Sequence, residues 1–381
     1  MMHLLDALRG LVAWTPLGLP AFLFVITLVV FFHELGHFLV ARFFGVKVEV
    51  FSIGFGREIV GFTDRRGTRW KISWLPIGGY VKFAGDADAA SKPDSEAASR
   101  MNAAERDGAL MFKPVAQRAA VAAAGPFANF LLAIVLLTGL FLHNGHAVIT
   151  PIIGEVTPGS PAAQAGLRPG DLVTRIDGHV INDFQQLPQI IGISGGETLR
   201  IALRRAGQDL TVNVTPRLTK TRDILGNVGS QMIIGVRQDP KAPVTQEQYG
   251  PIGAFGAAVS ETWNVIHTTI QGISQMITGR APPDQLRGTV GIAQMTKQVA
   301  EFGFLALLNL VAILSVSIGL ANLFPIPLLD GGHLLYYAVE AVLGRPLGER
   351  AQDVGFRLGL VLVLGLMLLT TWNDLVRLNL F

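Results

Sequence analysis

Four stretches of the chain are apolar over lengths that match the thickness of a bilayer. They cover about residues 19–41, 119–142, 302–324 and 355–371. A helix needs about 20 predominantly apolar residues to cross the hydrocarbon core. The pattern predicts a polytopic α-helical membrane protein with four transmembrane helices, and an even number of crossings puts both termini on the same side.

In the connection after the first apolar stretch, the pattern of polar and apolar residues changes to one typical of strands. Two runs, 58–62 and 68–75, flank the polar turn Asp64-Arg65-Arg66-Gly67. The second run alternates polar and apolar residues, as half-buried strands do. We therefore expect two paired strands between the first and second spans.

Residues 150–216 have the pattern of a small soluble domain inserted between the second and third spans. The string TPGSPA at 157–162 and the string AGLRPGD at 165–171 resemble those of PDZ domains in bacterial membrane-linked proteases. Such a domain has an α+β fold and binds peptides or C-termini by adding a strand to a sheet edge. Alternating apolar positions predict its strands at 172–176, 199–203 and 210–214.

The segment 150–156 aligns with the carboxylate-binding loop and strand of PDZ domains, which makes Ile153 and Gly154 candidate peptide-binding residues. A small β-rich domain without a ligand would show the same periodicity. The linker that follows, 217–301, contains apolar residues at helical spacing over about 252–278. This amphipathic helix could lie on the membrane surface or pack against the spans.

Composition agrees with a membrane protein. Half of the residues are hydrophobic, only 15% are charged and the mean hydropathy is +0.44. The net charge of +3 gives no reason to expect nucleic acid as a partner. Because the chain has no cysteine, any metal site must use His, Asp or Glu.

Positive charge predicts the orientation of the spans. The segment 42–118 carries 13 Lys and Arg residues, whereas 143–301 carries the same number over about twice the length. Arg345 and Arg350 lie in the short loop before the fourth span. Since basic residues near span ends favour the cytoplasm, we expect 42–118 and 331–354 inside and the PDZ-like domain outside.

The first span contains His33-Glu34-Leu35-Gly36-His37. Residues four apart share a helix face, so His33 and His37 could bind one metal ion, with the Glu34 carboxylate beside them to take a proton from water. On a solvated helix such a motif is often a coincidence. Here its flanks are apolar, and a charged group at membrane depth costs roughly 2.5–3.5 kcal/mol, which favours a ligand role.

The third span ends in a second polar cluster. Pro325 and Pro327 cannot continue an α-helix, so an extended backbone is expected there, followed by Asp330. The first and third spans cross in the same direction, which brings this break to the level of the histidine motif. Asp330 is therefore the preferred third metal ligand, with His333 as the competitor.

Three strings together resemble the site-2 protease family of intramembrane zinc metalloproteases, in its regulator-of-sigma-E protease branch. They are HELGH at 33–37, GPFAN at 125–129 and NLFPIPLLDG at 322–331. The resemblance implies zinc bound by His33, His37 and Asp330, with Glu34 as the general base. The candidate substrate-binding residues are Asn322, Pro325, Pro327 and Asn129, of which Asn129 could equally pack between helices.

The resemblance also implies a setting and a substrate. About residues 53–81 would form a membrane-associated β-hairpin on the cytoplasmic side. The protein would lie in the bacterial inner membrane, with a periplasmic PDZ domain that controls substrate access. Its substrate would be a single-span membrane protein, such as an anti-sigma factor, cut in regulated intramembrane proteolysis. Members of this branch carry two PDZ domains, whereas one is visible here, because 217–250 is too short for another.

Two other functions would explain part of the pattern. A membrane-tethered PDZ adaptor without catalysis would explain the spans but not an intact HELGH motif together with Asp330. A zinc or proton transporter would use intramembrane His and Asp residues. It would not need Glu34, the paired strands or the PDZ domain.

Overall fold

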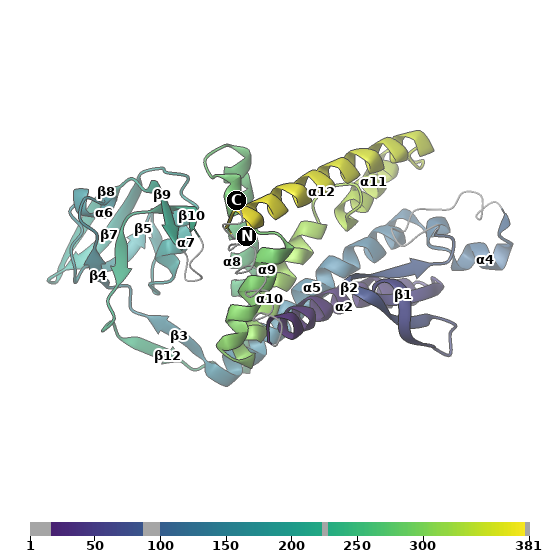
Figure 1. Cartoon of the computed structure of the whole chain (residues 1–381), viewed down its shortest axis with the longest axis horizontal. Coiled ribbons are helices and arrows are strands. Elements are labelled where there is room, and N and C mark those ends of the chain that lie inside the picture. Colours follow the sequence, from purple (N-terminus) through teal and green to yellow (C-terminus); the bar gives the residue numbers. More distant parts are fainter. Residues whose placement is uncertain (1–16, 87–99, 223–227, 378–381) are drawn as a thin grey trace, which may run out of the picture. The chain divides into compact units, whose positions relative to one another are not determined.

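The computed structural model describes residues 17–86, 100–222 and 228–377. The chain divides into two compact units. Their helices and strands are labelled in Figure 1. Unit 1 consists of residues up to Leu137 together with Thr289–Thr371. Unit 2 consists of Thr138–Gly288 and the residues from Trp372 onward.

Among the described residues, four helices are long and apolar enough to cross a membrane, as the sequence predicts. They are α2 (Gly18–Phe43), α5 (Val115–Asn144), α10 (Phe304–Asn322) and α12 (Glu349–Arg377). The fourth begins earlier than the predicted residue 355, because polar residues still suited to a helix precede its apolar part. Helix α5 contains Pro126 without interruption.

The core of unit 1 lies where α2, α5 and α10 meet. Val25 and Val29 of α2 and Val311 of α10 are completely buried there. Small residues allow close contact between the helices. A Cβ atom on Gly36 would lie 2.3 Å from the carbonyl oxygen of Ala124, so α2 and α5 cross at backbone distance.

Helix α9 (Thr289–Glu301) packs against α2 and α10 in the same core. From the sequence these residues belong to the linker, because their apolar positions are few and their burial depends on neighbouring helices. The remaining helical elements of unit 1 are α4 (Ala103–Gly108), η1 (Leu110–Phe112) and α11 (Asp330–Leu343).

The paired strands of unit 1 are longer than predicted. Strand β1 (Val48–Thr63) pairs antiparallel with β2 (Arg69–Phe83), and both bend. As a result Val50–Ile53 has β2 partners on both sides, at 69–72 and at 79–82. The buried face of this sheet packs against the C-terminal half of α2 through Phe38, Phe51 and Val81. The periodicity of a single strand could not reveal this contact.

Asp64 holds the turn between the strands and ties it to α2. Its carboxylate accepts hydrogen bonds from the Arg42 guanidinium (2.5 Å) and the Trp70 indole (3.1 Å). It also accepts from the backbone N–H groups of Arg66 and Thr68. Desolvation alone would raise the pKa of Asp64, but these donors hold that pKa well below its usual range.

Unit 2 contains a four-stranded sheet in the order β6-β5-β7-β8, together with two short helices. The core includes Ile153, Ile176, Ile201 and Leu203, and burying each such side chain contributes about 1.5–3 kcal/mol. The sheet strands are β5 (Leu172–Ile176), β6 (His179–Val180), β7 (Leu199–Arg205) and β8 (Gln208–Val214), and the helices are α6 (Pro161–Gln164) and α7 (Gln186–Gly192).

This body extends past residue 216, where the sequence analysis ended it. Ile234 lies in its core, and β11 (Val236–Gln238) pairs with β4 (Ile153–Val156). Pairing between strands so distant in the sequence leaves no local signal. Two further pairs belong to unit 2: β3 (His146–Ile149) with β12 (Val244–Glu247), and β9 (Arg217–Arg222) with β10 (Val228–Ile233).

The AGLRPGD string owes its form to Asp171. This carboxylate is completely buried and accepts two hydrogen bonds from the Arg205 guanidinium, each 2.7 Å long, and one from the backbone N–H of Arg168 at 2.8 Å. Such a charge-assisted, bidentate pair offsets the cost of burying the carboxylate. It fixes the loop that leads into β5.

Helix α8 (Pro251–Ile277) matches the predicted amphipathic helix and belongs to unit 2. Its end is attached to the β-rich body, since Gln275 donates to the carbonyl of Ile193 and Arg280 pairs with Glu197 at 2.7 Å. Apolar residues such as Trp263 and Ile252 remain exposed. The short η2 (Pro283–Gln285) follows.

Candidate metal centre and active site

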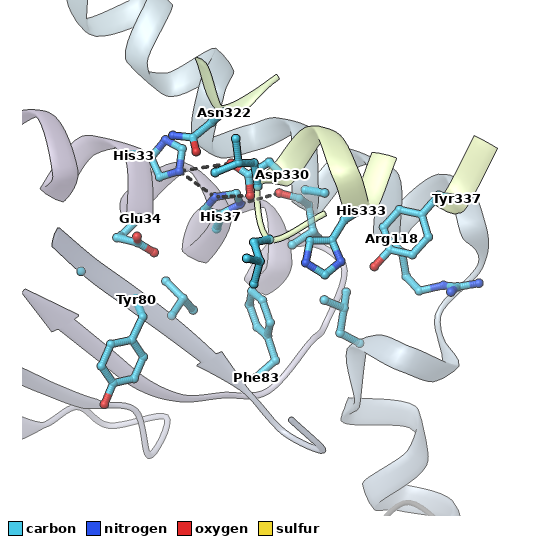
Figure 2. A pocket seen from close by; sticks show the side chains of 17 residues that line it. His33, Glu34, His37, Tyr80, Phe83, Arg118, Asn322, Asp330, His333 and Tyr337 are labelled. Carbon is cyan, nitrogen blue, oxygen red and sulfur yellow. Dashed lines mark hydrogen bonds and ion pairs between the residues drawn. The ribbon is translucent and has the colours of Figure 1, made fainter. Parts of the chain in front are cut away.

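Two histidines of α2 and one aspartate of α11 face one another in unit 1 (Figure 2). His33 Nε2 lies 3.2 Å from Asp330 Oδ2, and His37 Nε2 lies 3.4 Å from Asp330 Oδ1. The two Nε2 atoms are 3.3 Å apart. One ligand atom from each residue lies within 4.8 Å of the others, so a single cation could contact all three.

The local structure of α5 orients His37. The Nδ1–H group of His37 donates to the carbonyl oxygen of Val121 at 2.8 Å, which leaves Nε2 as the free ligand atom. Gly125 provides the space for the ring, because a Cβ atom there would lie 2.2 Å from Nε2. The backbone of α5 therefore fixes both the tautomer and the position of this imidazole.

The loop that interrupts the chain between α10 and α11 determines the position of Asp330. Helix α10 ends at Asn322, and a loop containing Pro325 and Pro327 leads to α11, whose first residue is Asp330. Gly331 and Gly332 pack against the carbonyls of that loop at distances that no side chain would allow. Asp330 thereby enters the bundle beside α2 at the start of a new helix.

The donor set matches zinc. Two neutral imidazole nitrogens and a carboxylate oxygen, with a further position left for water or substrate, form a common catalytic zinc site. Asp330 Oδ2 is buried, and within the part of the chain that the structure describes it has no hydrogen-bond donor apart from the facing imidazoles. A carboxylate oxygen in this state needs a cation or protonated partner. The residues therefore fit a zinc ion.

A cavity of about 220 Å³ opens next to these ligands. Glu34 lines it from α2, Asn322 from the end of α10, and Tyr80 from β2 (Figure 2). The Glu34 carboxylate thus borders the same space as the metal ligands. Pro325 and Pro327, which the sequence analysis named as substrate contacts, shape the loop but do not line the cavity, whereas the neighbouring Leu328 and Leu329 do.

One edge of the β1–β2 sheet borders this cavity. Residues 79–83 pair with 48–53 on one side. On the other side no strand pairs with them among the residues with defined positions, and Gly79, Tyr80, Val81 and Phe83 line the cavity. Gly79 allows the approach to α2, because its added Cβ would lie 3.1 Å from Cγ of Glu34.

His333, the competing third ligand, lies one helical turn after Asp330 and also lines the cavity. It is not part of the cluster of three ligand atoms. In Figure 2 its ring lies beyond Asp330, towards Tyr337. The geometry therefore favours Asp330 over His333 as the third metal ligand.

Asn129 is the candidate substrate-binding residue for which packing between helices is the alternative. It is completely buried and does not line the cavity. Helices α2, α5 and α10 enclose it, and its side chain lies beside His33, with Asn129 Nδ2 3.3 Å from His33 Nδ1. Burial of this position could not be predicted from an apolar helix alone.

Sequence reasoning also missed an ion pair that connects α5 to α11. Arg118 donates to both carboxylate oxygens of Glu340, at 3.0 and 2.5 Å, and its guanidinium lies 4.9 Å from the centre of the Tyr337 ring. Both charged side chains are mostly buried. The pair holds the helix that carries Asp330, and its only sequence signal is a glutamate in an otherwise apolar segment.

The candidate peptide-binding residues of unit 2 lie in β4. The Ile153 side chain is completely buried in the core, and its backbone N–H donates to the carbonyl of Asp171 at 2.9 Å. Gly154 lies against the backbone of Asp239. The Ile153 side chain therefore offers no surface to a peptide, and one edge of β4 is paired with β11.

Comparison with known proteins gives a consistent result. The family model described as "Peptidase family M50" matches residues 21–366. "Putative zinc metalloprotease Atu1380" of Agrobacterium fabrum is 47% identical over 355 residues, covering 93% of this chain and 94% of that protein. "Metalloprotease MmpA" of Caulobacter vibrioides is 39% identical over 385 residues, covering 95% and 96%.

Among solved structures, the PDZ domain of an SdrC-like protein from Listeria monocytogenes matches 24% of this chain and 88% of that chain. The two are 22% identical, with a TM-score of 0.20.

Proposed function

The chain belongs to peptidase family M50, and from this premise we propose that it is an intramembrane zinc endopeptidase acting on single-span membrane proteins. The observation that supports this best is the convergence of His33, His37 and Asp330 from two separate helices, with Glu34 beside them. Family membership makes the protein a zinc-dependent protease. The position of its ligands on apolar helices supports cleavage within or next to transmembrane segments.

His33, His37 and Asp330 would hold the zinc ion, which when bound polarises a carbonyl oxygen and lowers the pKa of water. Glu34 acts as the general base. Its carboxylate accepts a proton from the attacking water and then delivers it to the nitrogen of the leaving amine. Since Glu34 lines the cavity next to the ligands, no large movement is needed to bring it to the scissile bond.

A transmembrane substrate must unwind before it is cut, because its carbonyls are engaged in helical hydrogen bonds. The free edge at residues 79–83 can replace those bonds by pairing with the extended chain. Asn322, half-buried at the cavity wall, could hydrogen-bond to the same segment. Exposed apolar side chains such as Trp74 and Phe62 fit a hairpin in contact with lipid.

The remaining parts of the proposal concern setting and partners. The distribution of basic residues supports an inner-membrane protein of bacteria with 42–118 on the cytoplasmic side. A PDZ domain within unit 2 would then be periplasmic and would control access through a peptide or C-terminus. A membrane-bound anti-sigma factor is a substrate of the right kind, since cleavage would release its cytoplasmic part.

The test is proteolysis of a single-span reporter by purified protein in detergent. Glu34→Gln should retain zinc and thermal stability but lose activity by about 10²–10⁴-fold, the usual contribution of a general base. Wild-type protein treated with a chelator and then supplied with zinc serves as the control, and activity should return. Equal cleavage by wild type and Glu34→Gln would contradict the proposal.

A further inference from the structure

The two imidazoles of the metal centre are supported from the same helix but in different ways. His37 donates its Nδ1 hydrogen to the backbone carbonyl of Val121. His33 has no backbone carbonyl in the corresponding position; instead its Nδ1 faces the side-chain amide of Asn129, 3.3 Å from Nδ2. The Asn129 Oδ1 atom is buried and has no hydrogen-bond partner among the residues described.

With Asn129 Nδ2 facing His33 Nδ1, the amide favours the His33 tautomer that cannot bind a metal through Nε2. A neutral imidazole carries one hydrogen, so if Nδ1 accepts from the Asn129 amide, Nε2 carries that hydrogen and has no lone pair for a metal. A half turn of the amide about its Cβ–Cγ bond exchanges Nδ2 and Oδ1 without moving the rest of the side chain. The oxygen then accepts from Nδ1–H, and Nε2 of His33 becomes a ligand.

We propose that Asn129 is a positioning residue of the metal centre, whose amide oxygen holds His33 in the tautomer that binds the metal. The inference rests on the proposed zinc site. Complete burial of Asn129 and its absence from the cavity wall exclude direct contact with substrate. Helix α5 then supplies one oxygen acceptor behind each imidazole, from the Val121 backbone and from the Asn129 side chain.

Asn129 also contributes to packing, so the test must separate the two roles. Its backbone carbonyl accepts a hydrogen bond from Ser315 Oγ at 2.8 Å, and a Cβ atom on Gly319 would lie 3.0 Å from its Cβ. Asn129→Leu keeps four side-chain heavy atoms branched at Cγ but removes the acceptor. Asn129→Asp keeps the acceptor, and Ser315→Ala disturbs the same α5–α10 contact without touching His33.

Zinc affinity is measured on full-length protein in detergent by competition with a chromogenic chelator, alongside thermal stability. We expect Asn129→Leu to lower zinc affinity by about 10–100-fold, the usual cost of losing such a partner. Asn129→Asp and Ser315→Ala should stay within about threefold of wild type. Cobalt bound in place of zinc should show a changed absorption spectrum only in Asn129→Leu.

The possible results of the zinc-affinity measurement lead to different conclusions. Wild-type affinity in a folded Asn129→Leu protein would overturn the inference while leaving the zinc site intact. An equal loss in Asn129→Leu, Asn129→Asp and Ser315→Ala would overturn it in favour of packing. Absence of zinc from the wild-type protein itself would instead contradict the proposed function.

Discussion

At the scale of single residues, the metal centre depends on small and buried side chains as much as on its ligands. Gly125 gives His37 its space, and Gly331 and Gly332 let the loop before Asp330 fold back on itself. The candidate ligands His33, His37 and Asp330 can be predicted from residue spacing and from the proline break. The residues that orient them do not, because their roles depend on contacts between helices.

The choice of third ligand can be tested directly. Asp330→Ala should lower zinc affinity by more than about 100-fold, beyond the effect of losing an indirect partner. His333→Ala should leave bound zinc unchanged, because His333 lies outside the cluster of ligand atoms. Metal content of the purified variants gives the answer, and zinc loss in His333→Ala alone would reverse the assignment.

Gly125→Ala tests the space around His37. The added methyl group would lie 2.2 Å from Nε2, so the ring must move or the helices must separate. Overpacking of this kind costs about 1–3 kcal/mol, and we expect zinc affinity to fall at least tenfold. Gly139→Ala, in the same helix with open space around its Cβ position, should bind zinc like wild type.

At the scale of elements, hydropathy predicts the spans well, because the bilayer requires each spanning helix to be apolar whatever its neighbours are. The bent sheet and α9 can be predicted only in part, because both depend on contacts with other helices and strands. Residues 79–83 become an edge strand only because Val50–Ile53 already has 69–72 on its other side. No local pattern in the sequence encodes that arrangement.

The anchoring of this sheet to α2 should depend on pH through Asp64. Its pKa is lowered in the folded state relative to about 3.9 in the unfolded chain. Its bonds therefore stabilise the folded protein at neutral pH, and this stabilisation is lost as the pH falls below about 4, through the folded pKa. Asp64→Asn should lower the melting temperature most at pH 7, and the difference from wild type should narrow in acid.

Asp107→Asn is the matched control, since that carboxylate is 90% exposed and lies 3.6 Å from the Lys113 ammonium group. Its melting temperature should follow that of wild type at every pH. A difference between wild type and Asp64→Asn that stays constant from pH 7 to pH 3 would show that the Asp64 network does not contribute through ionisation.

At the scale of the whole molecule, two helices connect the units: α5 enters unit 2 at its end, and α12 ends there. Within unit 2 the end of α12 is bound to the segment after α8. Asn373 donates to the carbonyl of Pro283 at 2.8 Å, and Asp374 accepts from the backbone N–H of Gly288 at 3.1 Å. Within unit 2, two hydrogen bonds therefore hold the end of α12 to the segment after α8.

The absence of cysteine from the chain allows a direct test of its orientation. Single cysteines can replace three exposed residues in three different segments between the spans: Asp107 in α4, Gln208 at the start of β8, and Arg345 after α11. In intact cells with a permeabilised outer membrane, an impermeant thiol reagent should label only Gln208→Cys, because positive charge favours the cytoplasm for the other two. All three should react once the inner membrane is opened, which controls for accessibility. Labelling of Asp107→Cys in intact cells would reverse the proposed orientation, and with it the side on which the cleaved fragment is released.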